Sequence, residues 1–323
     1  MTRRNPMVIL HTDNPDPALE SLSAAHPGLP LHGCDSYAGL PALLDKTGAE
    51  VIFSVRFAGT PGYPRAALLN SKTLKWLSVG GSGTDHMNPW DPRKLTVTNA
   101  AGVAADMMAE YAIGAMLSFS LDLRGFARAQ AEREWIAGRV EPIAGKTVLI
   151  LGLGKTGQAV ARRAQAMGMT TLGVRARPRL TEHLDEIFGM DALPSLWLRA
   201  DFIVCCVPLL ENTRRLVDAK AFAAMKREAV LIDVSRGGVV EEAALVAALQ
   251  SGKLRGAALD VFTTEPLPRD HMLWSMQNVI ITPHCSSVYD GWEMKSLAMF
   301  CENLHRYRRG EVLENVVDPV RGY

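Results

Sequence analysis

Short apolar segments alternate with helix-forming segments along most of this 323-residue chain. A first series places apolar runs at 7–11, 51–55, 75–80 and 97–101, and a second series begins at residue 146. Parallel strands are joined through a crossover that is usually a helix, so this alternation predicts parallel sheets with helices on both faces. The length suits about two domains of this α/β class.

The second series contains six apolar runs separated by helical segments, a pattern typical of a doubly wound sheet of the dinucleotide-binding type. The runs are TVLILGLG, TTLGV, DFIVCCVP, AVLIDVS, GAALDVF and NVIITPH, and helices are predicted at 157–167, 195–199, 218–226 and 241–251. The chain closes with one further predicted helix, GWEMKSLAMFCENLHRYRRG.

A long apolar segment lies between the two series. Residues 104–125 predict one helix whose hydrophobic side chains cover most of its circumference, which implies burial on several sides. A polar helical stretch follows over 127–135. From the pattern alone, the apolar helix is either a strut between domains or a subunit interface.

The composition argues against several classes of protein. The 35 Lys and Arg residues nearly balance the 34 Asp and Glu residues, so we expect no nucleic-acid or membrane partner. No apolar run approaches the roughly 18 residues of a membrane span, and we find no signal-peptide pattern. The five cysteines lack metal-ligand spacing, and the adjacent Cys205 and Cys206 lie in an apolar run that predicts buried thiols in a reducing compartment. We therefore expect a cytoplasmic protein without a metal site.

The stretch GLGKTG follows an apolar strand and opens a helical segment, the context that gives a glycine turn its meaning. In a dinucleotide site Gly152 permits the tight turn, Gly154 lets the backbone approach a pyrophosphate, and Gly157 lets helix and strand pack closely. The backbone amides of Lys155 and Thr156 would then face the phosphates at the positive end of the helix. The alternative is an ordinary strand–turn–helix in which the glycines serve packing.

The next strand-like run, TTLGV, is followed by Arg175, where an enzyme that binds NAD carries an acidic residue. That acid accepts hydrogen bonds from the ribose 2′-hydroxyl of NAD, whereas an arginine accommodates the 2′-phosphate of NADP. Arg177 and Arg179 alternate behind it. The pattern predicts NADP(H) as the preferred cofactor, with NAD(H) as the alternative if these arginines are only solvated loop charges.

Three residues suited to chemistry each follow a strand of the second series, namely Arg236, Glu265 and His284. Hydride transfer to a 2-keto acid needs a group that anchors the carboxylate and polarises the carbonyl, and a group that delivers a proton. Arginine meets the first need and histidine the second. A carboxylate beside the histidine favours the imidazolium. Each residue by itself has an ordinary structural explanation, and their order and placement favour catalysis.

Long ordered motifs carry a resemblance over nearly the whole chain. They are GSGTDHMN (81–88), NAAGVAADMMAEYAI (99–113), GKTVLILGLGKTG (145–157), VPLLENTRRLVD (207–218), the block at 231–268, ITPH (281–284) and NLHRYRRGEVLENVVD (303–318). In these motifs the sequence resembles the D-isomer-specific 2-hydroxyacid dehydrogenases, the family of glyoxylate/hydroxypyruvate reductases, phosphoglycerate dehydrogenase and D-lactate dehydrogenase.

The resemblance implies a role for each residue of the catalytic group. Arg236 would bind the substrate carboxylate and carbonyl oxygen, His284 would be the general acid/base, and Glu265 would pair with His284. The backbone amides of Ser82 and Gly83 would help to hold the substrate carboxylate.

The resemblance also implies the cofactor pocket. Val207, Pro208 and Thr213 would line the adenine side, Asp260 would meet the nicotinamide amide, and Val234, Ser235 and Ser287 are also expected at the cofactor. Cys285 is either a nucleophile or a packing residue, and hydride transfer, which needs no covalent step, favours packing.

The family further implies a discontinuous arrangement of domains. A flavodoxin-like substrate domain takes residues 1–100 and 292–323, and a Rossmann NAD(P)-binding domain, 101–291, is inserted into it. The segment 104–140 would form the dimerisation helix and arm of a homodimer, which favours the interface over the strut. Loops near 55–62, 82–86 and 288–292 would wall the substrate pocket.

We therefore expect an oxidoreductase that reduces a small 2-keto acid, glyoxylate or hydroxypyruvate in the first instance, to the D-2-hydroxy acid with NADPH. An NAD-dependent D-2-hydroxyacid dehydrogenase for a bulkier acid is the main alternative. A dinucleotide-sensing corepressor, as some relatives of this fold are, is a third. The residues leave the identity of the acid open.

Overall fold

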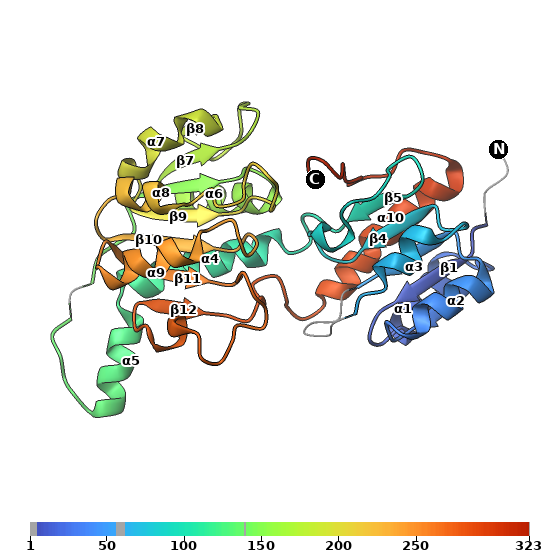
Figure 1. The fold of residues 1–323 in the computed structure, drawn as a ribbon, viewed down its shortest axis with the longest axis horizontal. Coiled ribbons are helices and arrows are strands. Elements are labelled where there is room, and N and C mark those ends of the chain that lie inside the picture. The colour runs from blue at the N-terminus through green and yellow to red at the C-terminus, as the bar shows by residue number, and fades with distance from the viewer. Residues whose placement is uncertain (1–4, 56–61, 139, 323) are drawn as a thin grey trace. The chain divides into compact units, whose positions relative to one another are not determined.

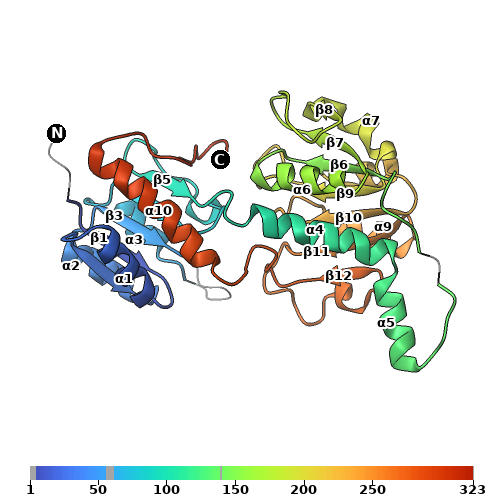
Figure 2. The same ribbon diagram turned by 180° about the vertical axis from the view of Figure 1, so that it is seen from behind.

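The structure, a computed structural model, describes residues 5–55, 62–138 and 140–322. The chain divides into two compact units. One consists of Met1–Val103 and Tyr289–Tyr323, and the other of Ala104–Val288. Each unit is a parallel sheet with helices on both faces (Figures 1 and 2), which confirms the predicted fold class.

The first unit contains a five-stranded parallel sheet of order β2-β1-β3-β4-β5, the flavodoxin-like order. Its strands are β1 (Val8–His11), β2 (Leu31–Cys34), β3 (Val51–Ser54), β4 (Trp76–Val79) and β5 (Thr96–Asn99). Its helices are α1 (Asp16–Ala25), α2 (Gly39–Thr47), α3 (Arg65–Asn70), the short 3₁₀ helix η1 (Asp85–Met87) and the C-terminal α10 (Trp292–Arg309).

The alternation of side chains along β1 divides the core of this unit in two. Val8 and Leu10 pack with α1 and α10 on one face, while Ile9 packs with α2 and α3 on the other. Successive strand residues point to opposite faces, and here both faces are covered. The strands at the centre of the sheet are therefore apolar throughout, which is why their sequences show continuous apolar runs.

The second unit contains a seven-stranded parallel sheet of order β12-β11-β10-β9-β6-β7-β8. Its strands are β6 (Thr147–Leu151), β7 (Thr170–Val174), β8 (Glu186–Phe188), β9 (Phe202–Cys205), β10 (Ala229–Asp233), β11 (Leu254–Leu259) and β12 (Val279–Ile281). Helices α4 (Ala105–Ser120) and α6 (Lys155–Ala166) pack on one face, and α7 (Leu193–Leu196), α8 (Ala219–Ala224) and α9 (Glu242–Gln250) on the other. The remaining elements are α5 (Leu123–Glu132) and the 3₁₀ helices η2 (Met190–Ala192), η3 (Trp197–Arg199) and η4 (Met272–Ser275).

The structure differs from the sequence predictions in two additional strands and in one helix that is divided into two. Strands β2 and β8 were not predicted, so the second sheet has seven strands rather than six. The prediction of one helix over 104–125 and a second helical stretch to 135 is wrong. The chain breaks after α4, because Asp122 adopts a left-handed backbone (φ 46°) and its side chain accepts a hydrogen bond from the Gly125 amide. The helix that this cap begins, α5, then ends at Glu132.

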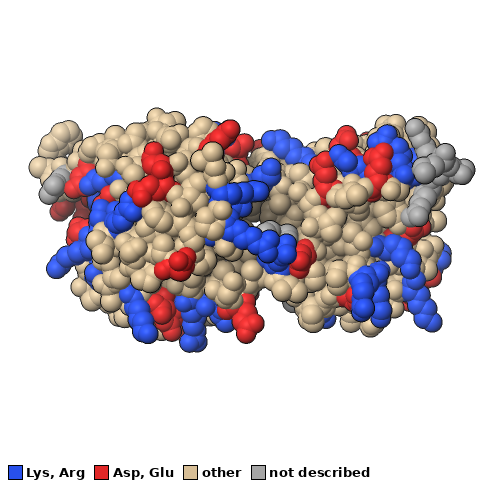
Figure 3. All heavy atoms as spheres, turned by 90° about the horizontal axis from the view of Figure 1, so that it is seen from above, with Lys and Arg blue, Asp and Glu red and all other residues tan. Residues whose placement is uncertain are grey.

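Charged side chains of both signs are interspersed on the face shown in Figure 3, in line with the balanced composition. Within the described residues, we find no helix that is long and apolar enough to cross a membrane. The same part of the chain contains no cluster of three or more side chains that could hold a metal ion.

His11 lies fully buried at the carboxyl end of β1, with its Nδ1 2.9 Å from the Ser54 hydroxyl. Burial lowers the pKa of His11 from 6.5 to about 4, although a hydrogen bond to the Ser36 backbone and the charge of Asp35 act in the opposite direction. The folded state therefore keeps this imidazole neutral over a pH range in which the unfolded chain protonates it.

We expect the contribution of His11 to stability to be complete above pH 6.5 and to be lost as the pH falls toward 4. The loss in unfolding free energy should reach at most about 3 kcal/mol. Denaturant unfolding between pH 7 and 4 should show a shallower pH dependence for His11→Gln than for the wild type, whereas His32→Gln, at an exposed position, should match the wild type. Equal slopes for the wild type and His11→Gln would contradict this assignment.

Candidate active site

The residues predicted for the site in the second unit follow the carboxyl ends of its strands. The glycine turn follows β6, Arg175 and Arg177 follow β7, Val207 and Pro208 follow β9, Val234 to Arg236 follow β10, Asp260 follows β11, and His284 follows β12. Because all seven strands run parallel, these segments gather along one edge of the sheet. In open α/β sheets this edge is where ligands bind, at the point where the strand order reverses, here between β6 and β9.

The glycine turn has the geometry of a phosphate cradle. Gly152 has φ 98°, and a Cβ there would lie 2.8 Å from the Cys206 carbonyl oxygen. A Cβ at Gly157 would lie 1.9 Å from the Gly152 carbonyl oxygen, so helix α6 approaches the turn more closely than any side chain permits. A Cβ at Gly154, by contrast, would meet no atom within 4 Å.

This open space at Gly154 lies at the N-terminus of α6, which begins at Lys155. Lys155 is exposed and Thr156 half-buried, and their backbone amides belong to the first turn of the helix, which has no intrahelical acceptors. A helix N-terminus with nothing above its glycine fits a pyrophosphate group.

Arg175 is positioned by the pairing of β6 with β7. Leu151 pairs with Val174, and the Gly152 amide donates a 2.9 Å hydrogen bond to the Val174 carbonyl. Arg175 therefore follows directly on the residue that binds the glycine turn. Its side chain is half-buried, with Nη1 3.4 Å from the Thr181 hydroxyl, while Arg177 is exposed.

Several residues predicted at the cofactor are buried, with hydroxyls that bond within their own loops. Thr213 donates to the Pro208 carbonyl at 2.6 Å and accepts from the Leu210 amide at 2.8 Å. Ser235 donates its hydroxyl and its amide to Asp233. Val207 and Val234 are also buried, whereas Pro208 and Ser287 are half-buried. What these loops can offer a ligand is mainly backbone and apolar surface.

Glu265 and His284 form a direct pair. The His284 Nδ1 lies 2.8 Å from Glu265 Oε2, and the Phe262 amide donates to Glu265 Oε1 at 3.0 Å. Partial burial by itself would raise the pKa of Glu265, but these two hydrogen bonds and the positive charges of His284 and Arg236 together hold it below its usual value. Glu265 thus stays ionised and fixes one nitrogen of the imidazole.

Arg236 is half-buried, and its Nη1 donates to the Ser235 carbonyl at 2.7 Å. Its charge acts on Glu265, so the structure brings together the three residues that were predicted as catalytic. Ser82 and Gly83 belong to the other unit, where the Asn99 amide donates to the Ser82 carbonyl at 2.7 Å. Their approach to this cluster stays a prediction.

Two features of the β10 segment were not predicted. Asp233 is fully buried, and this burial, together with the charge of Asp260, raises its pKa to about 7 despite the bonds from Ser235. A Cβ at Gly237 would lie 1.8 Å from the Phe262 carbonyl oxygen, so the Arg236 and Glu265 segments touch through their backbones. The sequence signal was an acid and a glycine flanking Ser-Arg, which is too common to identify these contacts.

The predicted pocket loops are described only in part. Residues 56–61 of the loop near 55–62 lie outside the described residues. In the loop near 288–292, the Tyr289 hydroxyl donates to the Val103 carbonyl at 2.8 Å. Cys285 is half-buried, burial raises its pKa above the usual value, and its amide donates to Asp260, which is consistent with packing.

A doubly wound sheet with this glycine turn and a paired histidine at its carboxyl edge defines a dinucleotide-binding oxidoreductase. A family model described as "D-isomer specific 2-hydroxyacid dehydrogenase, NAD binding domain" matches residues 113–286. The chain therefore belongs to the D-isomer specific 2-hydroxyacid dehydrogenase family, which confirms the family predicted from its motifs.

Individual relatives agree with this membership. D-3-phosphoglycerate dehydrogenase of Methanocaldococcus jannaschii is 34% identical over 283 residues, which are 85% of this chain and 53% of that enzyme, so the chain spans about half the length of this relative. The D-isomer specific 2-hydroxyacid dehydrogenase of Xanthobacter autotrophicus Py2 was solved with NADPH and MES. Its structure matches this one with a TM-score of 0.86 at 31% identity, over 99% of this chain and 100% of that enzyme's chain. The NADPH-dependent glyoxylate/hydroxypyruvate reductase of Sinorhizobium meliloti, solved with NADP and sulfate, has a TM-score of 0.83 at 27% identity, with coverage of 99% and 100%. These findings support an NAD(P)-dependent oxidoreductase with a nicotinamide dinucleotide as its cofactor.

The glycine turn yields a test with a matched control. We expect Gly157→Ala to destabilise the protein by about 1–3 kcal/mol, because the new methyl group collides with the backbone of Gly152. Gly154→Ala should leave the thermal midpoint of the cofactor-free protein unchanged and should weaken NADPH binding, since its methyl group enters the space assigned to the phosphates. Tm and NADPH fluorescence titrations of both variants check this. Unaltered NADPH binding by Gly154→Ala would show that the turn serves packing alone.

Proposed function

We propose that this protein reduces a small 2-keto acid to the D-2-hydroxy acid, with NADPH as the preferred cofactor. The observation that carries the proposal is the Glu265–His284 pair beside Arg236, on the same sheet edge as the glycine turn. Family membership supports the reaction class. The names of the relatives support both glyoxylate/hydroxypyruvate reduction and use of NADPH.

The nicotinamide cofactor, when bound, supplies the hydride. The half-buried Arg236 would hold the keto-acid carboxylate and draw electron density toward the carbonyl oxygen, because a guanidinium presents several donors in one plane. His284 would deliver a proton from Nε2 to the developing alkoxide, since its Nδ1 is bound to Glu265. Glu265 keeps the imidazole oriented through its hydrogen bond to Nδ1. The amides of Ser82 and Gly83 would complete the carboxylate site.

We infer the cofactor contacts from the same edge. Gly152, Gly154 and Gly157 with the amides of Lys155 and Thr156 would hold the pyrophosphate. Arg175 and Arg177 would hold the 2′-phosphate. The remaining cofactor surface would come from Val207, Pro208, Thr213, Val234, Ser235, Asp260 and Ser287. In this proposal the unit Ala104–Val288 binds the dinucleotide and the other unit supplies the substrate site.

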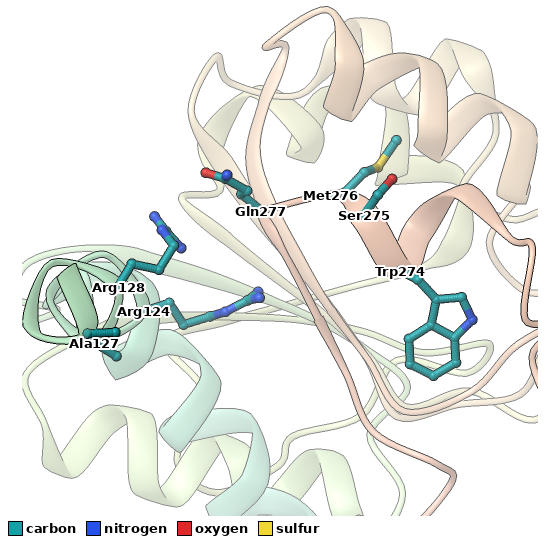
Figure 4. A pocket seen from close by; sticks show the side chains of 8 residues that line it. Arg124, Ala127, Arg128, Trp274, Ser275, Met276 and Gln277 are labelled. Carbon is teal, nitrogen blue, oxygen red and sulfur yellow. The ribbon is translucent and has the colours of Figure 1, made fainter.

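We also propose a homodimer formed through the segment 104–140. Trp135 is fully exposed and Ile136 is 44% exposed, in a stretch that follows α5. An open cleft of about 400 Å³ lies between α5 and the η4 segment, with Arg124 and Arg128 on one side and Trp274 on the other (Figure 4). Exposed apolar surface of this kind is a feature of protein–protein interfaces, which supports the proposed dimer.

The activity is tested with a panel of 2-keto acids and both reduced cofactors, followed by absorbance. We expect reduction of glyoxylate or hydroxypyruvate by the wild type and loss of kcat by about 10²–10⁴-fold in His284→Asn. Asparagine tolerates the left-handed backbone of this position (φ 53°), so the variant removes the imidazole without adding strain. Arg236→Gln should raise KM for the keto acid and lower kcat.

Arg227→Ala, at an exposed position of the same unit, serves as the control and should keep wild-type rates. Preference for a bulkier acid with NADH would favour the NAD-dependent D-2-hydroxyacid dehydrogenase instead. Full cellular function in His284→Asn, without keto-acid reduction, would favour the corepressor.

The cofactor preference is tested separately. Arg175→Asp should lower the ratio of kcat/KM with NADPH to kcat/KM with NADH by about 10–100-fold, because it replaces a charge-assisted hydrogen bond with repulsion of the 2′-phosphate. Arg179→Asp makes the same change in charge at an exposed position farther along the loop and should alter the ratio far less. Equal ratios in the wild type and Arg175→Asp would mean that these arginines are solvated loop charges.

A further inference from the structure

The loop that carries His284 has an unusual backbone. His284 adopts a left-handed conformation (φ 53°), which L-residues other than glycine rarely occupy. Its amide donates to the Thr282 carbonyl at 3.0 Å, two residues earlier, which closes a tight turn. A residue keeps such a conformation only when its surroundings enforce it, so the contacts on either side of His284 decide where its imidazole points.

Asp260 supplies those contacts. It is almost fully buried, and its Oδ1 accepts hydrogen bonds from the Cys285 amide at 2.9 Å and from the Thr282 hydroxyl at 2.7 Å. Its Oδ2 accepts from the Ser286 amide at 3.0 Å. The carboxylate thus binds the loop two residues before His284 and at the two residues directly after it.

A further hydroxyl extends this network to another element. The Tyr111 hydroxyl, on helix α4, lies 2.9 Å from the Thr282 hydroxyl. Thr282 has one hydroxyl proton, and the geometry directs it to Asp260, so Tyr111 donates to Thr282 and Thr282 donates to Asp260. Hydrogen bonds in such a chain polarise and strengthen one another. Burial, with the charges of Asp260, Cys285 and Asp233, raises the pKa of Tyr111 to about 12 although Thr282 acts in the opposite direction, so the donor keeps its proton.

We propose that Tyr111 and Thr282 are positioning residues for the proton donor: their hydroxyl chain orients the Asp260 carboxylate, which holds His284 in its left-handed conformation and in register with Glu265. The inference rests on the proposed function for its kinetic consequence. It links Tyr111, on helix α4, to the proposed proton donor through a path of two hydroxyls and one carboxylate.

The hydrogen-bonded path from Tyr111 to Asp260 can be interrupted by removing single hydroxyl groups. Tyr111→Phe removes one hydroxyl and keeps the ring that packs on the apolar core with the neighbouring residues of α4. Thr282→Val removes the relay hydroxyl at nearly constant shape, and Thr282→Ser restores it. Tyr307→Phe is the matched control, because it removes a part-buried tyrosine hydroxyl that donates to Glu50 in the other unit.

The kinetic experiment measures kcat, KM for the keto acid and the pH profile of kcat/KM, with NADPH affinity and Tm alongside. Tyr111→Phe and Thr282→Val should each lower kcat roughly tenfold, the size expected for losing one buried hydrogen bond, with NADPH affinity within about twofold of the wild type. The limb of the pH profile that reports the proton donor should shift in both variants. Thr282→Ser should recover most of kcat, and Tyr307→Phe should lower Tm without changing kcat or the pH profile.

A second readout does not depend on activity. In ¹⁵N-histidine-labelled protein, the Nδ1 proton of His284 should give a downfield resonance through its bond to Glu265, and this resonance should broaden in Tyr111→Phe and Thr282→Val. If the wild type reduces no keto acid but the resonance broadens in the two variants, the proposed function is contradicted and the positioning role is supported. An active wild type whose kcat, pH profile and resonance are all unchanged in Tyr111→Phe and Thr282→Val overturns the inference. If Tyr111→Phe fails to fold, the contrast between Thr282→Val and Thr282→Ser decides in the same way.

Discussion

The close approach of helix α6 to the turn before it governs the geometry of the candidate site. A side chain at Gly157 would collide with the Gly152 carbonyl, and one at Gly152 with the Cys206 carbonyl, so three backbone segments meet without intervening side chains. This contact places the positive end of α6 above the carboxyl end of β6, between β9 and β7. The strand register then fixes where every following loop begins, and the loops of β10, β11 and β12 emerge along the same edge.

Buried carboxylates organise this edge, where the rest of the unit relies on apolar packing. Asp233 binds the turn before Arg236, and Asp260 binds the loop around His284. A carboxylate removed from water must receive hydrogen bonds, and backbone amides of short loops are the donors nearest to it. The segments of Arg236 and His284, the side chains proposed as catalytic, are thus bound by two acids: Asp233 ends β10, and Asp260 follows the last residue of β11.

The apolar runs predicted the central strands of both sheets, because strands covered on both faces have continuous apolar sequences. Strands β2 and β8 lie at sheet edges and were missed, because LHGC and EIF are short and only partly buried and so lack a continuous apolar run. The end of α4 was misplaced because Asp122 interrupts a segment that stays apolar beyond it, and an N-cap inside such a segment is not distinguishable by pattern. Glu265 and His284, 19 residues apart, were predicted together from their places after strands, and the structure pairs them. The contact of Tyr111 with Thr282 was not predicted, because the two residues are 171 positions apart and no local pattern links them.

The pairing of β6 with β7 is set by backbone atoms, whereas the proposed cofactor preference depends on a side chain that follows β7. The Gly152–Val174 hydrogen bond and the pairing of Leu151 with Val174 use backbone atoms, so any residue at position 175 leaves β7 at the same point beside the glycine turn. The side chain there is half-buried and contributes little to the core, so its charge can change while the sheet stays as it is. In the proposed cofactor site, Arg175 and Arg177 therefore decide between a ribose hydroxyl and a ribose phosphate from a position that the backbone fixes. The loop of the proposed proton donor, by contrast, is held in place by the hydrogen bonds that Asp260 receives from Thr282, Cys285 and Ser286.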